Sequence, residues 1–86
     1  DKIEKFIIDN KNIYGTLASM FLAKKYVLDN NLEKAIKQLE TSLKYTKDEI
    51  LKNILLLKIV SLEIEQNQNE RALNTLKQVN DKNWIN

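Results

Sequence analysis

The sequence predicts an all-α fold made of antiparallel helical hairpins, as a fragment of a longer array of such hairpins. Its 86 residues include no Pro and one Gly, so residues that break helices are nearly absent. Apolar residues recur at intervals of three and four in about five segments, which is the spacing of amphipathic helices. Residues 22–43 predict two helices folded back on each other at Asn30 and Asn31, and a weaker copy follows at residues 59–79.

The first two helices are expected over residues 2–10 and about 13–28. In the first, Ile3, Phe6 and Ile7 share one face. Asn12 is expected to cap the second helix, because an Asn side chain accepts hydrogen bonds from the free amides of a first turn. Small residues in the second helix, which allow a neighbouring helix to approach closely, are Gly15, Ala18, Ser19 and Ala23. Its broad apolar surface consists of Tyr14, Leu17, Ala18, Phe21, Leu22 and Val27.

The third helix is expected over about residues 32–45, after a turn in which Asn30 can adopt the left-handed conformation. Its inner face consists of Leu32, Ala35, Ile36, Leu39 and Leu43. The following Thr46-Lys47-Asp48-Glu49 has the form of a capping box, in which Thr46 and Glu49 would each satisfy a free backbone amide. The fourth helix is therefore predicted to run from about residue 47 to residue 65.

The fourth helix is apolar around much of its circumference, so we expect it to be covered on several sides. A turn at residues 67–69 precedes a fifth helix over residues 70–79, whose inward residues are predicted to be Ala72, Leu73, Leu76 and Val79. Residues 80–83 are expected to form a loop, and Trp84 to open a further helix. The carboxylates, including the pairs Asp48/Glu49 and Glu63/Glu65, are interpreted as part of a solvated face.

The hairpins are similar to tetratricopeptide repeats, with units at about residues 13–45 and 48–79 and a partial unit at each end of a single domain over residues 1–86. Equivalent positions such as Ala35 and Ala72 lie 37 residues apart, against a usual period of about 34. The helix at residues 2–10 then corresponds to the second half of a preceding unit. The alternative is a generic antiparallel helical bundle.

The amino-acid composition argues against several classes of function. With no Cys and no His, the chain cannot build a zinc site, a thiol nucleophile or a histidine base, so we expect no metal, no cofactor and no enzyme activity. The net charge of +2 is spread along the chain without a basic block, which argues against nucleic acid as a partner. No apolar run approaches the roughly 20 residues of a membrane span, so we expect none within these residues. The chain begins at Asp1 and not at Met, so there is room for a targeting or membrane segment upstream of it.

In repeat arrays of this kind, the first helix of each hairpin lines the concave surface. The repeat register predicts a mostly apolar groove with two sets of partner-binding residues. The first set is Leu17, Met20, Lys24, Val27 and Leu28, and the second is Ile54, Leu57, Ser61, Ile64 and Glu65. We expect the groove to bind an apolar segment of an unfolded client or of a partner helix. The alternative is that these residues are core, covered by missing repeats.

One passage is more specific than the repeat pattern. It consists of Glu4-Lys5-Phe6, Asn10-Lys11-Asn12-Ile13-Tyr14-Gly15-Thr16-Leu17-Ala18-Ser19 and Leu22-Ala23, and continues through Asn31-Leu32-Glu33-Lys34-Ala35, Gln38-Leu39, Asp48-Glu49, Leu51-Lys52, Ala72-Leu73 and Thr75-Leu76 to Trp84. Across nearly the whole chain this sequence resembles the ancillary SecYEG translocon subunit family. Asn83 departs from the Gly expected before the Trp.

The resemblance implies a single-span inner-membrane protein of Gram-negative bacteria, with a tetratricopeptide-like domain in the periplasm. It implies association with the Sec translocon and a periplasmic chaperone, and a role in helping newly exported proteins. The family carries no catalytic motif, so no catalytic residue is implied. Two rival functions are a structural scaffold that self-associates through open repeat ends, and a cytosolic regulatory tetratricopeptide adaptor.

Overall fold

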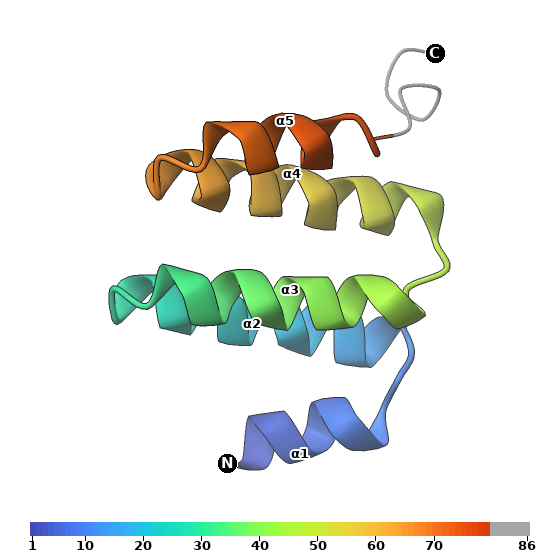
Figure 1. Ribbon diagram of the computed structural model, residues 1–86. Coiled ribbons are helices and arrows are strands. Elements are labelled where there is room, and N and C mark those ends of the chain that lie inside the picture. Colours follow the sequence, from blue (N-terminus) through green and yellow to red (C-terminus); the bar gives the residue numbers. More distant parts are fainter. Residues whose placement is uncertain (80–86) are drawn as a thin grey trace. The chain divides into compact units, whose positions relative to one another are not determined.

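The computed structural model describes residues 1–79, and in this range it contains five α-helices and no strand. The helices are α1 (Lys2–Asp9), α2 (Ile13–Leu28), α3 (Leu32–Tyr45), α4 (Glu49–Glu65) and α5 (Asn69–Leu76), as shown in Figure 1. The predicted all-α fold of helical hairpins is thus confirmed. The expected loop at residues 80–83 and the helix opened by Trp84 lie outside the described residues.

The chain divides into two compact units, Asp1–Thr46 and Lys47–Asn86. In the first unit, α2 and α3 pack as an antiparallel hairpin, and α1 packs against α2 (Figure 1). In the second unit, α4 and α5 pack as an antiparallel hairpin. Each unit therefore contains one complete helical hairpin.

Small residues bring α2 and α3 close together in the first hairpin. On α3, Ala35, Ile36 and Leu39 are almost completely buried, as predicted for its inner face. On α2, the buried side consists of Gly15, Thr16, Ser19, Leu22 and Ala23. The Ser19 hydroxyl accepts a hydrogen bond from Gln38 Nε2 at 3.2 Å, so this buried polar group is satisfied within the hairpin.

Gly15 lies where the chain leaving α1 crosses the start of α2. A Cβ atom at this position would overlap the backbone carbonyl oxygen of Asn10 and lie 3.1 Å from the Tyr45 hydroxyl oxygen. Asn12 caps α2 as predicted, because its side-chain oxygen accepts hydrogen bonds from the amides of Tyr14 at 3.0 Å and Gly15 at 3.3 Å. The close passage of backbone at Gly15 thus positions α1 against α2.

Two Asn residues close the hairpins. Asn30 has a φ of 63° and Asn67 a φ of 60°, both in the left-handed region. Most residues lose about 1–2 kcal/mol in this conformation, whereas the short polar side chain of Asn tolerates it. The expected left-handed turn at Asn30 is confirmed, and Asn31 follows it as the N-cap of α3.

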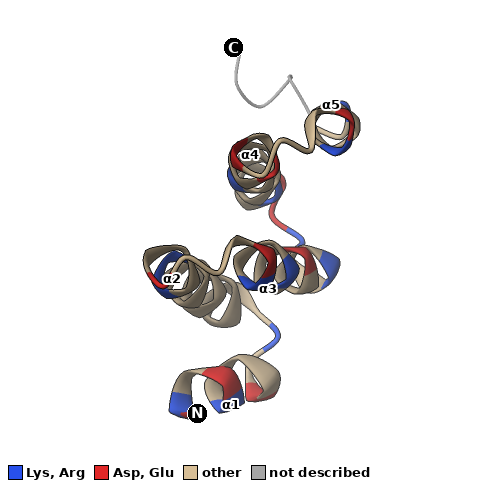
Figure 2. Cartoon of the chain, turned by 60° about the vertical axis from the view of Figure 1, so that its left-hand side comes forward, with Lys and Arg blue, Asp and Glu red and all other residues tan. Residues whose placement is uncertain are grey.

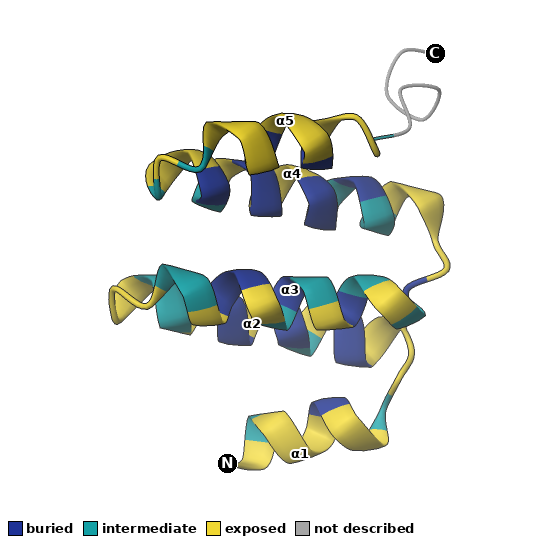
Figure 3. Cartoon of the chain, in the orientation of Figure 1, coloured by how far each residue is buried: buried dark blue, intermediate teal, exposed yellow. Residues whose placement is uncertain are grey.

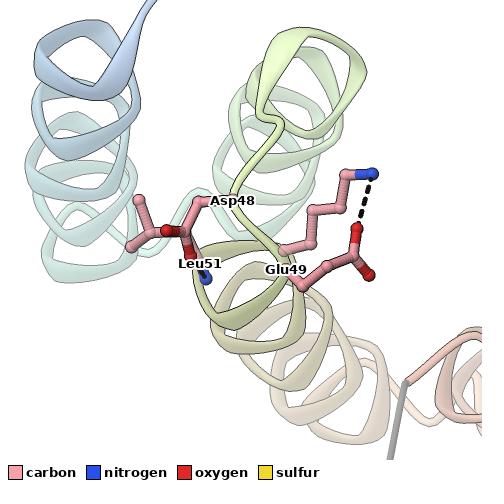
Figure 4. A network of polar contacts seen from close by, with 4 residues as sticks. Asp48, Glu49 and Leu51 are labelled. Atoms are coloured by element: carbon pink, nitrogen blue, oxygen red, sulfur yellow. Dashed lines mark hydrogen bonds and ion pairs between the residues drawn. The ribbon is translucent and has the colours of Figure 1, made fainter. Parts of the chain in front are cut away.

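The predicted capping box at the start of α4 is wrong. Asp48, and not Thr46, is the N-cap, since its carboxylate accepts a hydrogen bond from the Leu51 amide at 2.9 Å (Figure 4). Glu49 instead forms an ion pair with Lys52 at 3.1 Å. The helix consequently begins at Glu49, two residues later than expected.

The reason lies in the first unit, where the Thr46 hydroxyl is already engaged. It donates to the Ser42 carbonyl oxygen at 2.7 Å and shares a 2.8 Å hydrogen bond with the Thr16 hydroxyl. Thr46 is buried there, at the end of α3. Because this side chain completes the first hairpin, the next residue able to cap a helix, Asp48, takes that role.

The predicted inward face of α5 is also partly wrong. Ala72 and Thr75 are its buried residues, whereas Leu73 and Leu76 remain 54% and 46% exposed. The helix ends at Leu76 and Val79 is half-buried. Ala72 and Thr75 are three residues apart, so they share the side of α5 that packs against α4.

Glu63 does not belong to a solvated face, contrary to the expectation. Its side chain is 2% exposed, and its Oε2 lies 3.4 Å from Nε of Arg71 on α5. On α4 it follows the buried residues Leu56, Ile59 and Val60 at helical spacing, which places it on the same buried side. A buried carboxylate is costly unless paired, and Arg71 supplies the compensating charge.

Candidate protein-binding surfaces

Helix α2 has a second, exposed side opposite the hairpin core. Tyr14 is 66% exposed, Phe21 56% and Leu28 76%, and Ile13 and Leu17 are also about half-exposed. Single apolar residues on a surface are normal, but here five large ones share one side of a 16-residue helix. We call this set, with the adjoining lysines, the α2 face; its residues are Ile13, Tyr14, Leu17, Phe21, Lys24, Lys25 and Leu28.

The α2 face is positively charged as well as apolar. Lys24 and Lys25 are exposed, and the Lys25 ammonium nitrogen lies 5.9 Å from the centre of the Phe21 ring. Between Ile13 and Leu28 the sequence contains no Asp or Glu. In Figure 2 the other helices carry both signs of charge, whereas α2 is mostly uncharged. The face therefore suits a partner that combines apolar and acidic groups.

The structure places the predicted α2 residues at or next to this face. Leu17, Lys24 and Leu28 are exposed and belong to it, while Met20 and Val27 are half-buried at its edge. The groove prediction omitted Tyr14 and Phe21, although both had been assigned to the apolar surface of this helix. Helical spacing from Leu17 and Leu28 would have indicated them, since residues three, four and seven apart share a face.

In the second unit, α4 presents a separate exposed line. Leu57, Ser61, Ile64 and Glu65 are exposed, and Ile54 is half-buried. Ile50, which the groove prediction omitted, is also exposed; with Leu57 and Ile64 it recurs every seven residues. In the described part of the chain none of the ten predicted groove residues is buried, so all are accessible to a partner (Figure 3 shows burial along each helix).

Contacts of the Tyr26 side chain join α2 to both α1 and α3. The Tyr26 hydroxyl donates to the Glu4 carboxylate at 3.5 Å, and the Lys34 ammonium nitrogen lies 5.1 Å from the centre of the Tyr26 ring. Loss of hydration, and then the negative charge and hydrogen bond of Glu4, raise the pKa of Tyr26. These contacts join elements within the first unit and are structural.

The main features of the described residues are helical hairpins with exposed apolar helix faces. Residues 1–79 contain no group of three or more acidic side chains that could hold a metal ion. None of their helices has both the length and the apolar character needed to cross a membrane. Helical hairpins with exposed apolar helix faces define the class: an all-α protein-interaction domain.

The family follows from comparison with known proteins. A family model described as the tetratricopeptide repeat-like domain matches residues 1–86. The chain therefore belongs to the tetratricopeptide repeat-like domain family. No solved structure matches this chain.

Three relatives carry the name ancillary SecYEG translocon subunit, so the resemblance seen in the sequence is confirmed. The protein of Buchnera aphidicola subsp. Schizaphis graminum is 56% identical over 84 residues, covering 98% of this chain and 43% of the relative. That of Buchnera aphidicola subsp. Acyrthosiphon pisum is 51% identical over 85 residues, 99% and 44% of the two chains. That of Escherichia coli K12 is 42% identical over 81 residues, 94% and 39%. The chain thus spans less than half the length of these relatives.

Proposed function

We propose that this chain is a non-enzymatic protein-binding module that works with the Sec translocon. The observation that carries the proposal is its identity of 42–56%, over nearly the whole chain, to proteins named as ancillary subunits of SecYEG. The exposed apolar faces of α2 and α4 support it, because such helix faces bind partner helices and apolar segments.

The proposal includes a location and a task. The domain lies in the periplasm as part of a single-span inner-membrane protein, whose span is outside this chain. There it acts beside the translocon and a periplasmic chaperone, and assists newly exported proteins as they emerge. The sequence resemblance supports this assignment.

The proposed binding surface is the predicted groove, formed in a repeat array by the first helix of each hairpin. The hairpins α2–α3 and α4–α5 then belong to repeat units at about residues 13–45 and 48–79, with partial units at both ends of the domain. Accessibility of all ten groove residues supports this surface.

The test of function is co-purification of SecYEG with the full-length parent protein from detergent-solubilised membranes. Recovery of SecYEG with the parent protein is expected, and its absence would contradict the proposal. The double variant Met20→Glu/Leu57→Glu should weaken recovery without loss of helicity by circular dichroism. A matched control, Thr41→Glu/Asn74→Glu, makes the same change in net charge at exposed positions outside the predicted groove and should have no effect. Loss of helicity in the groove variant would instead identify Met20 and Leu57 as core.

Two further measurements separate the rival functions. Protease added to spheroplasts should digest the domain if it is periplasmic, and protection until lysis would indicate the cytosolic adaptor. Sedimentation velocity over a range of concentrations should show a monomer. A concentration-dependent dimer would favour the self-associating scaffold.

A further inference from the structure

Five residues of α2 follow the spacing of a coiled-coil seam. Tyr14, Leu17, Phe21, Lys24 and Leu28 are separated by three, four, three and four residues, which is the a/d pattern of a heptad repeat. All five are exposed. The opposite side of α2 is already packed against α3, so this line is available without opening the hairpin. Its geometry matches a second helix lying along α2.

The length of the line sets the size of that helix. From Tyr14 to Leu28 the helix axis rises about 21 Å, at about 1.5 Å per residue. A partner helix of roughly 15–20 residues, with its own apolar residues at a and d positions, would cover this length. The segment that fits is therefore a short amphipathic helix.

The lysines of the α2 face favour a negatively charged partner helix. Lys24 lies within the seam, and the Lys25 ammonium nitrogen is held 5.9 Å from the centre of the Phe21 ring. Covering these cations with an apolar helix alone would remove them from water without a counter-charge, which is unfavourable. The helix has no carboxylate between Ile13 and Leu28, and the nearest acidic residue in sequence is Asp29 at its C-cap. We therefore expect the compensating charge along the seam to come from the partner.

The corresponding line on α4 lacks this selectivity. Ile50, Leu57 and Ile64 are flanked by both a lysine, Lys58, and a carboxylate, Glu65, and all five are exposed. A line with both signs can satisfy either charge on a partner. The one-sided charge of the α2 face is thus a property of that helix and not of the fold.

We propose that the α2 face binds an acidic amphipathic helix of another protein, with apolar residues along the seam and carboxylates opposite Lys24 and Lys25. This names the chemistry of the partner and rests on the proposed protein-binding function. A single charged residue in an apolar seam is a device that selects register and partner at some cost in affinity.

The test uses three synthetic 21-residue helical peptides with identical leucine seams and Glu, Gln or Lys at the flanking positions. Fluorescence anisotropy titrations with the unaltered chain come first. The Glu peptide should bind about tenfold more tightly than the Lys peptide, from the difference between two attractive and two repulsive charge pairs. This preference should shrink in high salt. Equal affinity for all three peptides would overturn the proposal.

A second test reverses the charge of the two lysines on the α2 face. The variant Lys24→Glu/Lys25→Glu should reverse the order of the Glu and Lys peptides. Its matched control, Lys37→Glu/Lys44→Glu, makes the same change in net charge at exposed positions of α3 and should keep the original order. Phe21→Ser should weaken binding of the Glu peptide about tenfold, as expected for loss of an anchoring aromatic, while Leu73→Ser, at an exposed apolar position of α5 outside the predicted groove, should leave it unchanged. An unchanged preference after charge reversal would overturn the proposal.

The α2 face could instead be covered by a lipid surface or by a second copy of the chain, and each gives a different experimental result. Binding to vesicles of anionic lipid, with no binding of the Glu peptide, would show a membrane-facing surface and overturn the proposal. A dimer that Phe21→Ser abolishes would show that a second copy covers the face, and would overturn it too. If the peptides fail while SecYEG still co-purifies, only this inference falls; if peptide selectivity holds without SecYEG, the proposed function falls instead.

Discussion

Replacement of Gly15 by Ala should destabilise the first unit, although the same change in an open helix is stabilising. A Cβ atom here would overlap the Asn10 carbonyl oxygen, a backbone atom, and would lie 3.1 Å from the Tyr45 hydroxyl oxygen. Gly15 does not have a positive φ, so its own backbone conformation is open to Ala. Any loss of stability in the Ala variant is therefore expected to come from the close contact between Gly15 and the Asn10 backbone.

Two opposing contributions determine the magnitude. Ala is favoured over Gly in a helix interior by about 1 kcal/mol. Overpacking against fixed neighbours costs about 1–3 kcal/mol. If the overlap were relieved by moving α1 away, the buried Ile7 would be exposed, at a cost of about 1.5–3 kcal/mol. Subtracting the gain of about 1 kcal/mol from either cost leaves a net loss of up to about 2 kcal/mol in the free energy of unfolding.

Urea unfolding followed by circular dichroism measures this difference. Thr41→Ala, at an exposed position of α3, is the matched control and should stabilise the chain by about 0.6 kcal/mol through helix propensity alone. Hydrogen exchange should show faster exchange of α1 amides in the Gly15 variant than in the control. If Gly15→Ala stabilised the chain as Thr41→Ala does, the close approach at Asn10 would be refuted.

Three further predictions concern single side chains. Asp48→Ala should lower the free energy of unfolding by about 1 kcal/mol through loss of the N-cap, and Glu49→Ala by less than about 0.5 kcal/mol; equal losses in urea titrations would contradict the cap assignment. Arg71→Met leaves the buried Glu63 carboxylate without its cation and should cost about 1–2 kcal/mol, less in a Glu63→Gln background; strictly additive losses in this double-mutant cycle would count against the pair. Tyr26 has a raised pKa, so its contribution is complete below the unfolded pKa of about 10 and is lost as pH rises through the folded pKa. Tyr26→Phe should therefore reduce the alkaline loss of thermal stability, and parallel stability–pH curves for the two proteins would refute this.

Local signals were sufficient for the second and third helices. Asn12 and Asn31 cap them, and Asn30 supplies the left-handed turn between them, so the predicted bounds of residues 13–28 and 32–45 agree with α2 and α3. These features depend on residues within one or two turns of each other. A sequence pattern is sufficient where the interaction that decides the structure is itself local.

The start of α4 shows where that reasoning fails. Thr46 and Asp48 are both good capping residues, and only the hydrogen bond between Thr46 and Thr16, 30 residues apart in sequence, decides between them. The burial of Glu63 has a similar origin. Its carboxylate is tolerated on the buried side of α4 because Arg71, on the neighbouring helix, lies beside it.

For the candidate binding surfaces too, part could be predicted from the sequence and part depends on how the helices pack. The sequence alone predicts α2 and α4 as the binding helices, and this stays a prediction; the predicted residues on them are accessible. The groove prediction does not include Tyr14 and Phe21, although helical spacing puts them on the side of Leu17; packing against α3 leaves both exposed and Met20 half-buried.

The sequence by itself determined the helical class and the hairpin turns, since these depend on local spacing and capping chemistry, and its resemblance to known proteins indicated the family. Only the tertiary structure decided which residue begins α4, which carboxylate is buried and which side of α2 is open to a partner. Each of those outcomes depends on contacts between helices, and such contacts exist only once the hairpins have formed.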